Sequence, residues 1–177
     1  MEQVAVAGEV VVARGVVSPR RVQDALRVLH IDLLERGAAA SELGEWLWGT
    51  HWFPHLRERP EIIALADDLP GAWQEGTPCE PQILLQFPHV GPVPEITYHL
   101  DEEPHWAQGR RYLRIVGVPL SPWHAENGGL LVKGPDGPVP VELEPGDAVM
   151  MTPDVPHSGG INRLGTIRYG VYFRWLA

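Results

Sequence analysis

The second half of the chain alternates short apolar runs with turn-forming residues, and this alternation restricts the fold more than any other feature. After Pro81 the runs are rich in branched and aromatic side chains, and Gly, Pro, Asn or Asp separates most of them. Such runs are typical of β-strands, and such separators are typical of the turns between strands. The runs are Ile83–Phe87, Glu95–Leu100, Tyr112–Val118, Leu130–Val132, Val139–Leu143, Ala148–Met151 and Ile167–Trp175. This pattern predicts a β-sandwich or a β-barrel.

The first half of the chain carries helix signals instead. Ser18 and Pro19 supply an N-cap and a first-turn proline, apolar residues follow at three- and four-residue spacing, and Gly37 ends the pattern. A helix over about 19–36 is therefore expected. Shorter helices are expected over about 41–48 and 60–69, and one short strand around 9–13. The helices should cover one face of the sheet.

Length and composition favour one domain in a reducing compartment. The chain has 177 residues and no internal repeat or linker, so we expect a helical part over about 1–80 and a β core over about 81–177. A net charge of −9 argues against non-specific nucleic-acid binding. A single cysteine excludes an internal disulfide. The chain shows no targeting segment and no apolar run of about 20 residues, which predicts a cytoplasmic protein without a membrane partner.

One short triplet is a candidate for metal binding. On an extended strand His99 and Asp101 point to the same face, so an imidazole and a carboxylate can lie side by side. His157, if the fold brings it close, completes two histidines and one carboxylate, the facial ligand set of non-haem Fe(II) oxygenases. A lone His-x-Asp triplet also occurs as an ordinary core or surface pair. The other close pair, His51 and His55, is interrupted by a proline, so a packed aromatic connection is expected there.

An arginine beyond His157 suggests a co-substrate. Arg168 follows His157 by eleven residues, on the last predicted strand. A metal at His157 could chelate the keto-acid end of 2-oxoglutarate, whose distal carboxylate would then need a fixed bidentate cation such as arginine. Gln86, Thr152 and Thr166 are further candidates for contacting this co-substrate, although both threonines can equally be ordinary strand residues.

Several motifs taken together resemble those of the phytanoyl-CoA dioxygenase-like oxygenases. In this chain the segment Gly8-Glu9-Val10-Val11-Val12, followed by Gly15-Val16-Val17-Ser18-Pro19 and the amphipathic helix, is similar to the N-terminal part of these oxygenases. Their first two metal ligands resemble His99-x-Asp101, and their Asn-Gly turn resembles Glu126-Asn127-Gly128-Gly129-Leu130. Their C-terminal strand, third ligand, asparagine and 2-oxoglutarate arginine resemble Gly146–Met150, His157, Asn162 and Arg168. The resemblance covers almost the whole chain in the same order.

This resemblance implies both a fold and a chemistry. The fold is mainly β with flanking helices, a double-stranded β-helix (jelly-roll, cupin-like) core with N-terminal helices packed on one sheet. The implied cofactors are Fe(II), held by His99, Asp101 and His157, and 2-oxoglutarate with dioxygen. The implied activity is that of a non-haem Fe(II)- and 2-oxoglutarate-dependent dioxygenase that hydroxylates an unactivated C–H bond of a small molecule. Halogenases of this superfamily lack the carboxylate ligand, so Asp101 favours hydroxylation. Asn162 resembles a site residue but is also a common turn residue.

Two departures from the family pattern bear on the substrate. Members often carry Pro-Gly-Ser-His after the Asn-Gly turn, where this chain has Leu131–Gly137. The chain is also short, which favours a small substrate or an open site over a bulky acyl-CoA. Trp106, Trp123 and Arg111 are candidate substrate contacts, although core packing of the tryptophans and pairing of the arginine with nearby acids are equal alternatives. A non-catalytic jelly-roll binding protein and a cupin-type metal enzyme that does not use 2-oxoglutarate remain the rival functions.

Overall fold

The computed structural model describes residues 3–7, 10–36, 56–79, 81–93, 95–101 and 112–177. The strands are β1 (Gln3–Ala7), β2 (Val10–Ala13), β3 (Thr77–Pro78), β4 (Gln82–Gln86), β5 (Tyr112–Pro119), β6 (Leu130–Gly134), β7 (Gly137–Val141), β8 (Ala148–Met151), β9 (His157–Gly159) and β10 (Arg168–Leu176). The helices are α1 (Pro19–Arg36), α3 (Pro60–Ile63) and the 3₁₀ helices η2 (Ala64–Asp68) and η3 (Gly71–Trp73). None of the helices that the structure describes is long and apolar enough to cross a bilayer.

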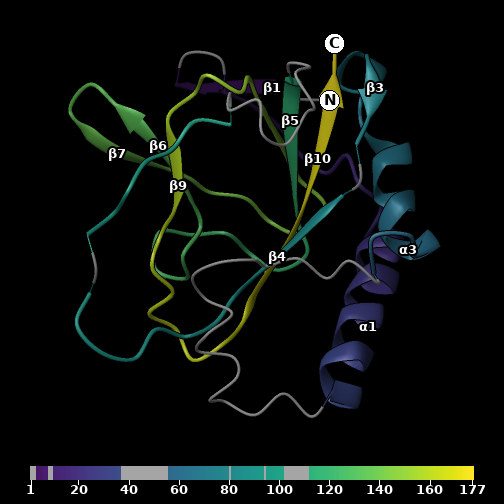
Figure 1. Cartoon of the computed structure of the whole chain (residues 1–177), viewed down its shortest axis with the longest axis horizontal. Helices are drawn as coiled ribbons and strands as arrows, with labels where there is room; N and C mark the ends of the chain where they lie inside the picture. Colours follow the sequence, from purple (N-terminus) through teal and green to yellow (C-terminus); the bar gives the residue numbers. More distant parts are fainter. Residues whose placement is uncertain (1–2, 8–9, 37–55, 80, 94, 102–111) are drawn as a thin grey trace.

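Two antiparallel sheets form the body of the molecule. The larger sheet has the strand order β1-β2-β8-β5-β10-β3, and β4 also pairs with β10. The smaller sheet has the order β7-β6-β9. Figure 1 shows β6, β7 and β9 on one side of the long strand β10 and the helices α1 and α3 on the other. The predicted jelly-roll fold, with a helix covering one sheet, is confirmed.

Strand β10 separates the two halves of the core. Side chains alternate between the two faces of a strand, and on β10 the odd-numbered residues, such as Val171 and Phe173, pack in the cluster that contains the buried face of α1. The even-numbered residues face the space between the sheets, where Tyr172 joins a second apolar cluster. Arg168 and Arg174 share this inner face with Tyr172. Two arginines therefore point into the interior of the jelly roll.

Helix α1 begins where the sequence predicts. The Ser18 carbonyl accepts the Val22 N–H at 3.2 Å, and the Ser18 N–H donates to Asp68 at 2.9 Å, which ties the start of the helix to η2. Val22, Ala25 and Leu29 are buried against the larger sheet. The helix expected over 60–69 is present as α3 continued by η2, while the one expected over 41–48 lies outside the described residues.

The turn before β8 is held by a buried aspartate. Asp147 accepts hydrogen bonds from the Gly15 N–H at 2.9 Å and the Glu144 N–H at 2.9 Å, and it pairs with Arg14 at 2.6 Å. Gly146 precedes it with φ +98°, a conformation that favours glycine. This buried carboxylate joins the end of β2 to the start of β8, the strand that leads toward His157.

One strand prediction is confirmed and another is corrected. The strand expected around 9–13 is present as β2, while β1, which pairs with β2 and places Gln3 opposite Ala13, was not predicted. The expected strand Glu95–Leu100 is reduced to a single bridge between His99 and His157. Beyond His99 the ladder does not extend toward Asp101, because the N–H of Val155, which would face Asp101, donates to the Thr152 carbonyl instead.

Close packing at Gly170 gives a stability prediction. A Cβ at this position would overlap the ring of Trp123, which is completely buried and has no room to move aside. We expect Gly170→Ala to lower the free energy of unfolding by about 1–3 kcal/mol, as overpacking of a filled core does, measured by urea denaturation. Gly165→Ala is the matched control, because its added methyl meets nothing within 4 Å. Equal stabilities of the two variants would contradict this account.

Candidate metal centre

The fold brings the three predicted metal ligands together. His99, Asp101 and His157 each offer one ligand atom, and these atoms all lie within 4.8 Å of one another. His99 and Asp101 belong to the segment that crosses β9 at its first residue, His157. The backbone of His99 exchanges two hydrogen bonds with that of His157, at 3.0 and 3.1 Å, and the Asp101 N–H donates to Pro153 at 3.0 Å. These backbone hydrogen bonds therefore fix the relative positions of the three backbones.

The protonation of His157 suits a metal ligand. Its Nδ1 lies 2.9 Å from the Val155 carbonyl oxygen, which can only accept, so Nδ1 carries the proton and Nε2 is left with its lone pair. Burial lowers the pKa of His157 below its usual value, and this effect outweighs the opposing effects of Val155 and Asp101. The imidazole is neutral near pH 7 and presents Nε2 to the site.

The carboxylate of Asp101 divides its two oxygens between different partners. Oδ1 lies 3.8 Å from Nε2 of His99, and Oδ2 lies 2.9 Å from Nη2 of Arg174. Burial alone would raise the pKa of Asp101, but Arg174 and the two histidines overcome this and hold the pKa below its usual value. The carboxylate is therefore ionised, and one oxygen is directed toward the histidines.

Arg168 is buried and has no acidic partner among the described residues. Its Nε and Nη2 donate to Oε1 of Gln86 at 3.1 and 2.7 Å, and its guanidinium lies 5.0 Å from the ring centre of Trp123. The amide of Gln86 is fixed in turn, because its Nε2 donates to the Gly160 carbonyl. Nη1 is buried without a hydrogen-bond partner in the described part of the chain. Burial lowers the pKa of Arg168, and the hydroxyl of Tyr172 opposes this shift.

The inner face of β10 connects Arg168 with the metal ligands. The pKa of Tyr172 is raised by burial, while Arg168 and Arg174 both lower it and Asp101 raises it. The hydroxyl therefore lies within electrostatic reach of both the trio and the guanidinium. Sequence reasoning assigned no site role to Tyr172 or Arg174. Their spacing from Arg168 by even numbers on one strand was the signal that could have found them.

The other predicted co-substrate residues have different positions. Asn162 is buried, and its amide is fully used: it donates to the carbonyls of Gln86 at 2.9 Å and Thr166 at 2.7 Å and accepts the Leu164 N–H at 3.0 Å. Asn162 thus braces the loop before β10 instead of contacting a co-substrate. Thr166 is exposed, which argues against its predicted contact. Thr152 is half-buried in the turn that leads to His157, and its role stays a prediction.

The predicted substrate contacts receive no support from the described residues. Trp123 is completely buried, its indole N–H donates to the Tyr169 carbonyl at 3.0 Å, and its ring stacks on Tyr172. Tyr172 and Arg168 both lie against the indole, which favours core packing, the alternative left open for Trp123, and its contact with a substrate stays a prediction. Trp106 and Arg111 lie outside the described residues.

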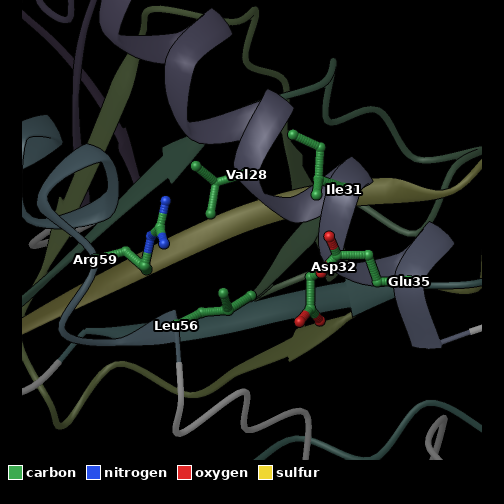
Figure 2. A pocket seen from close by; sticks show the side chains of 6 residues that line it. All are labelled: Val28, Ile31, Asp32, Glu35, Leu56 and Arg59. Carbon is green, nitrogen blue, oxygen red and sulfur yellow. The ribbon is translucent and has the colours of Figure 1, made fainter.

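A separate hollow of about 230 Å³ lies beside α1, away from the trio. Figure 2 shows Val28, Ile31, Asp32 and Glu35 entering it from α1, and Leu56 and Arg59 from the segment before α3. None of the metal ligands contributes to it. The hollow mixes apolar and charged side chains without converging on one chemistry, and we assign it no role.

Comparison with known proteins supports the fold. No protein-family model matches the chain, and no curated protein matches it. The non-heme alpha ketoglutarate dependent epimerase SnoN from nogalamycin biosynthesis has a TM-score of 0.60 and 20% identity, over 94% of this chain and 76% of SnoN. This chain has the fold of SnoN. AviO1 from Streptomyces viridochromogenes Tue57 shares it, with a TM-score of 0.61 and 19% identity over 97% of this chain and 91% of AviO1. So does the carbocyclase SnoK, with a TM-score of 0.60 and 19% identity over 95% of this chain and 79% of SnoK.

Proposed function

We propose that this protein is a non-haem Fe(II)- and 2-oxoglutarate-dependent oxygenase of the phytanoyl-CoA dioxygenase-like type, acting on a small molecule. His99, Asp101 and His157 would hold the metal, and Arg168 would bind the distal carboxylate of 2-oxoglutarate. The observation that carries the proposal is the buried guanidinium of Arg168. It faces the same interior as the trio, lacks a carboxylate partner among the described residues and leaves Nη1 unsatisfied.

The donor set fits the proposed metal. Two imidazoles and one carboxylate suit Fe(II), and three protein ligands leave open positions for a co-substrate and dioxygen. A buried cation without an anion is costly, so a dicarboxylate that chelates the metal and reaches Arg168 would satisfy both ends of the site. The single cysteine favours a reducing compartment such as the cytoplasm, which would also keep iron ferrous.

The residues supply binding, orientation and water exclusion. Gln86 holds the Nε edge of Arg168, so the Nη1 end is the part of the guanidinium left for a carboxylate. Val155 fixes the tautomer of His157, and Arg174 holds one oxygen of Asp101. Fe(II) held by His99, Asp101 and His157 would supply dioxygen activation, in which one oxygen atom would enter succinate as 2-oxoglutarate loses carbon dioxide and the other would oxidise the substrate. Trp123 and Tyr172 exclude water beside Arg168.

The prime substrate is proposed to be a small molecule oxidised at a C–H bond, with hydroxylation as the expected outcome. The solved structures named above include an epimerase and a carbocyclase, and SnoN has been crystallised with Fe3+, alpha ketoglutarate and nogalamycin RO. The side chain of His99 is 56% exposed, while that of Asp101 is only 15% exposed. A substrate would thus approach the metal from the side of His99, and the presence of Asp101 favours hydroxylation over halogenation.

A ligand-binding experiment tests this proposal before any substrate is known. Metal-free protein is loaded with Fe(II) under argon and heated with or without 2-oxoglutarate. At a hundred times its Kd a ligand stabilises the native state by about 2.7 kcal/mol, so the melting temperature should rise by about 5–10 °C. Glutarate is the matched control, because it keeps both carboxylates but lacks the keto group, and it should give a much smaller shift.

The same experiment separates the rival functions. A cupin-type enzyme that does not use 2-oxoglutarate would bind metal and show no shift with 2-oxoglutarate. A non-catalytic binding protein would take up no metal, or would bind it without consuming 2-oxoglutarate in air. Succinate formation that requires Fe(II) would support the proposed oxygenase against both rivals.

A further inference from the structure

Arg174 lies in the interior of the jelly roll, and its contact with Asp101 bears on how that carboxylate would bind a metal. It lies on the inner face of β10, opposite Ile115 of β5. Its side chain is 16% exposed and donates from Nη2 to Oδ2 of Asp101 at 2.9 Å. Unlike Arg168, it has a carboxylate partner, and that partner is the candidate metal ligand.

The guanidinium of Arg174 is held in place from several sides. The Arg174 carbonyl accepts the Cys79 N–H at 2.9 Å, so its backbone is fixed on the edge opposite β5. Its guanidinium lies 5.8 Å from the ring centre of Tyr112, within cation–π range. The backbone of Asp101 is pinned independently by Pro153. The ion pair therefore joins two groups whose main chains are already positioned.

Holding one oxygen of a carboxylate changes what the other can do. A free carboxylate can bind a metal through one or both oxygens, and two-oxygen binding would occupy a position that a co-substrate needs. In this structure Oδ2 is engaged by Arg174, while Oδ1 lies 3.8 Å from Nε2 of His99. Charged groups bonded to metal ligands in this way orient the ligand and tune the site.

We propose that Arg174 is the positioning residue of the metal centre, which restricts Asp101 to binding the metal through Oδ1 alone. The proposal rests on the proposed metal site, but it does not depend on Arg168 or on 2-oxoglutarate. Arg174 keeps Oδ2 turned away from the histidines, so the positions opposite the three ligands stay open. Its charge also balances the buried carboxylate when no metal is bound.

The test uses Co(II) alone as the probe, because its absorption spectrum reports coordination number. Wild-type protein is titrated first, followed by Arg174→Met, Arg174→Lys and the control Arg114→Met. Arg114 is a suitable control because it lies on the neighbouring strand β5 and pairs with an acid, Glu75, at 3.2 Å, away from the metal ligands. Melting temperatures of the metal-free forms are measured alongside.

The expected result separates positioning from a structural role. Arg174→Met should weaken Co(II) binding about 10–100-fold and alter the Co(II) spectrum, because the released carboxylate becomes free to bind through both oxygens. Arg174→Lys should recover most of the affinity, since an ammonium can still pair with Oδ2. Arg114→Met should match wild type in affinity and spectrum.

Three outcomes would overturn the proposal. If Arg174→Met lowers only the melting temperature and leaves Co(II) affinity and spectrum unchanged, the ion pair is purely structural. If it tightens Co(II) binding with an unchanged spectrum, Arg174 acts as a competing charge and not as a positioning residue. If wild-type protein does not bind Co(II), the metal site itself fails and the inference fails with it. If the wild-type protein binds Co(II) but not 2-oxoglutarate, the proposed co-substrate is contradicted, and this inference about Arg174 still holds.

Discussion

His99→Ala is expected to abolish metal binding and Fe(II)-dependent consumption of 2-oxoglutarate while the fold remains intact. The imidazole is one of three proposed ligands, and losing it should cost at least as much as the 10–100-fold that loss of an outer partner costs. The fold should survive because the side chain is 56% exposed and the bridge to His157 uses only backbone groups. Metal content by mass spectrometry, succinate release and the melting temperature of the metal-free protein measure the three quantities.

His124→Ala is the matched control for this variant. His124 is also a partly exposed histidine, but its partner is Glu144 at 3.4 Å, and it contributes nothing to the trio. We expect its metal content and succinate release to equal those of wild type. A His99→Ala protein that still binds one metal ion and releases succinate would show that the trio is not the metal centre.

Arg168→Met is expected to remove 2-oxoglutarate binding without affecting the metal. Methionine keeps much of the bulk against Trp123 but has no charge for the distal carboxylate. Truncating one partner of a buried, hydrogen-bonded charge pair costs about 2–5 kcal/mol, so the Kd for 2-oxoglutarate should rise about thirtyfold or more. Calorimetric titration of the metal-loaded, oxygen-free protein measures this Kd.

The stability of the same variant distinguishes a ligand-binding arginine from a structural one. In the ligand-free protein Arg168 is a buried cation without an acidic partner in the described part of the chain. Replacing it should therefore leave the melting temperature of the ligand-free form unchanged or raise it, because a desolvated charge is removed. The stabilisation by 2-oxoglutarate should vanish. Arg163 is exposed and precedes β10, so the control variant Arg163→Met should keep the stabilisation by 2-oxoglutarate. A large loss of ligand-free stability with normal 2-oxoglutarate binding would contradict the assigned role.

The periodicity of the chain was sufficient to predict much of the architecture. The helix α1 was predicted from the spacing of Val22, Ala25 and Leu29 after Ser18-Pro19, because a surface helix needs one apolar face and a defined start. Short apolar runs after Pro81 predicted most of the strands, because alternating side chains on a strand must be buried on at least one face. The run Glu95–Leu100 failed as a strand because a ladder also needs free backbone groups on the facing segment, where the N–H of Val155 is used by the Thr152 carbonyl.

Local sequence also proposed His99, Asp101, His157 and Arg168, since their residue types limit the chemistry they can perform. Only the tertiary structure decided how they are used. In the fold, two backbone hydrogen bonds bring His99 beside His157. Arg168 is buried without an acidic partner among the described residues, and Arg174 forms an ion pair with Asp101. The amide of Asn162 donates to the Gln86 carbonyl, and the side chain of Trp123 is part of the buried core. These outcomes depend on register and on contacts between strands distant in sequence, which no local pattern encodes, because a side chain's partner is set by the strand that the fold places beside it.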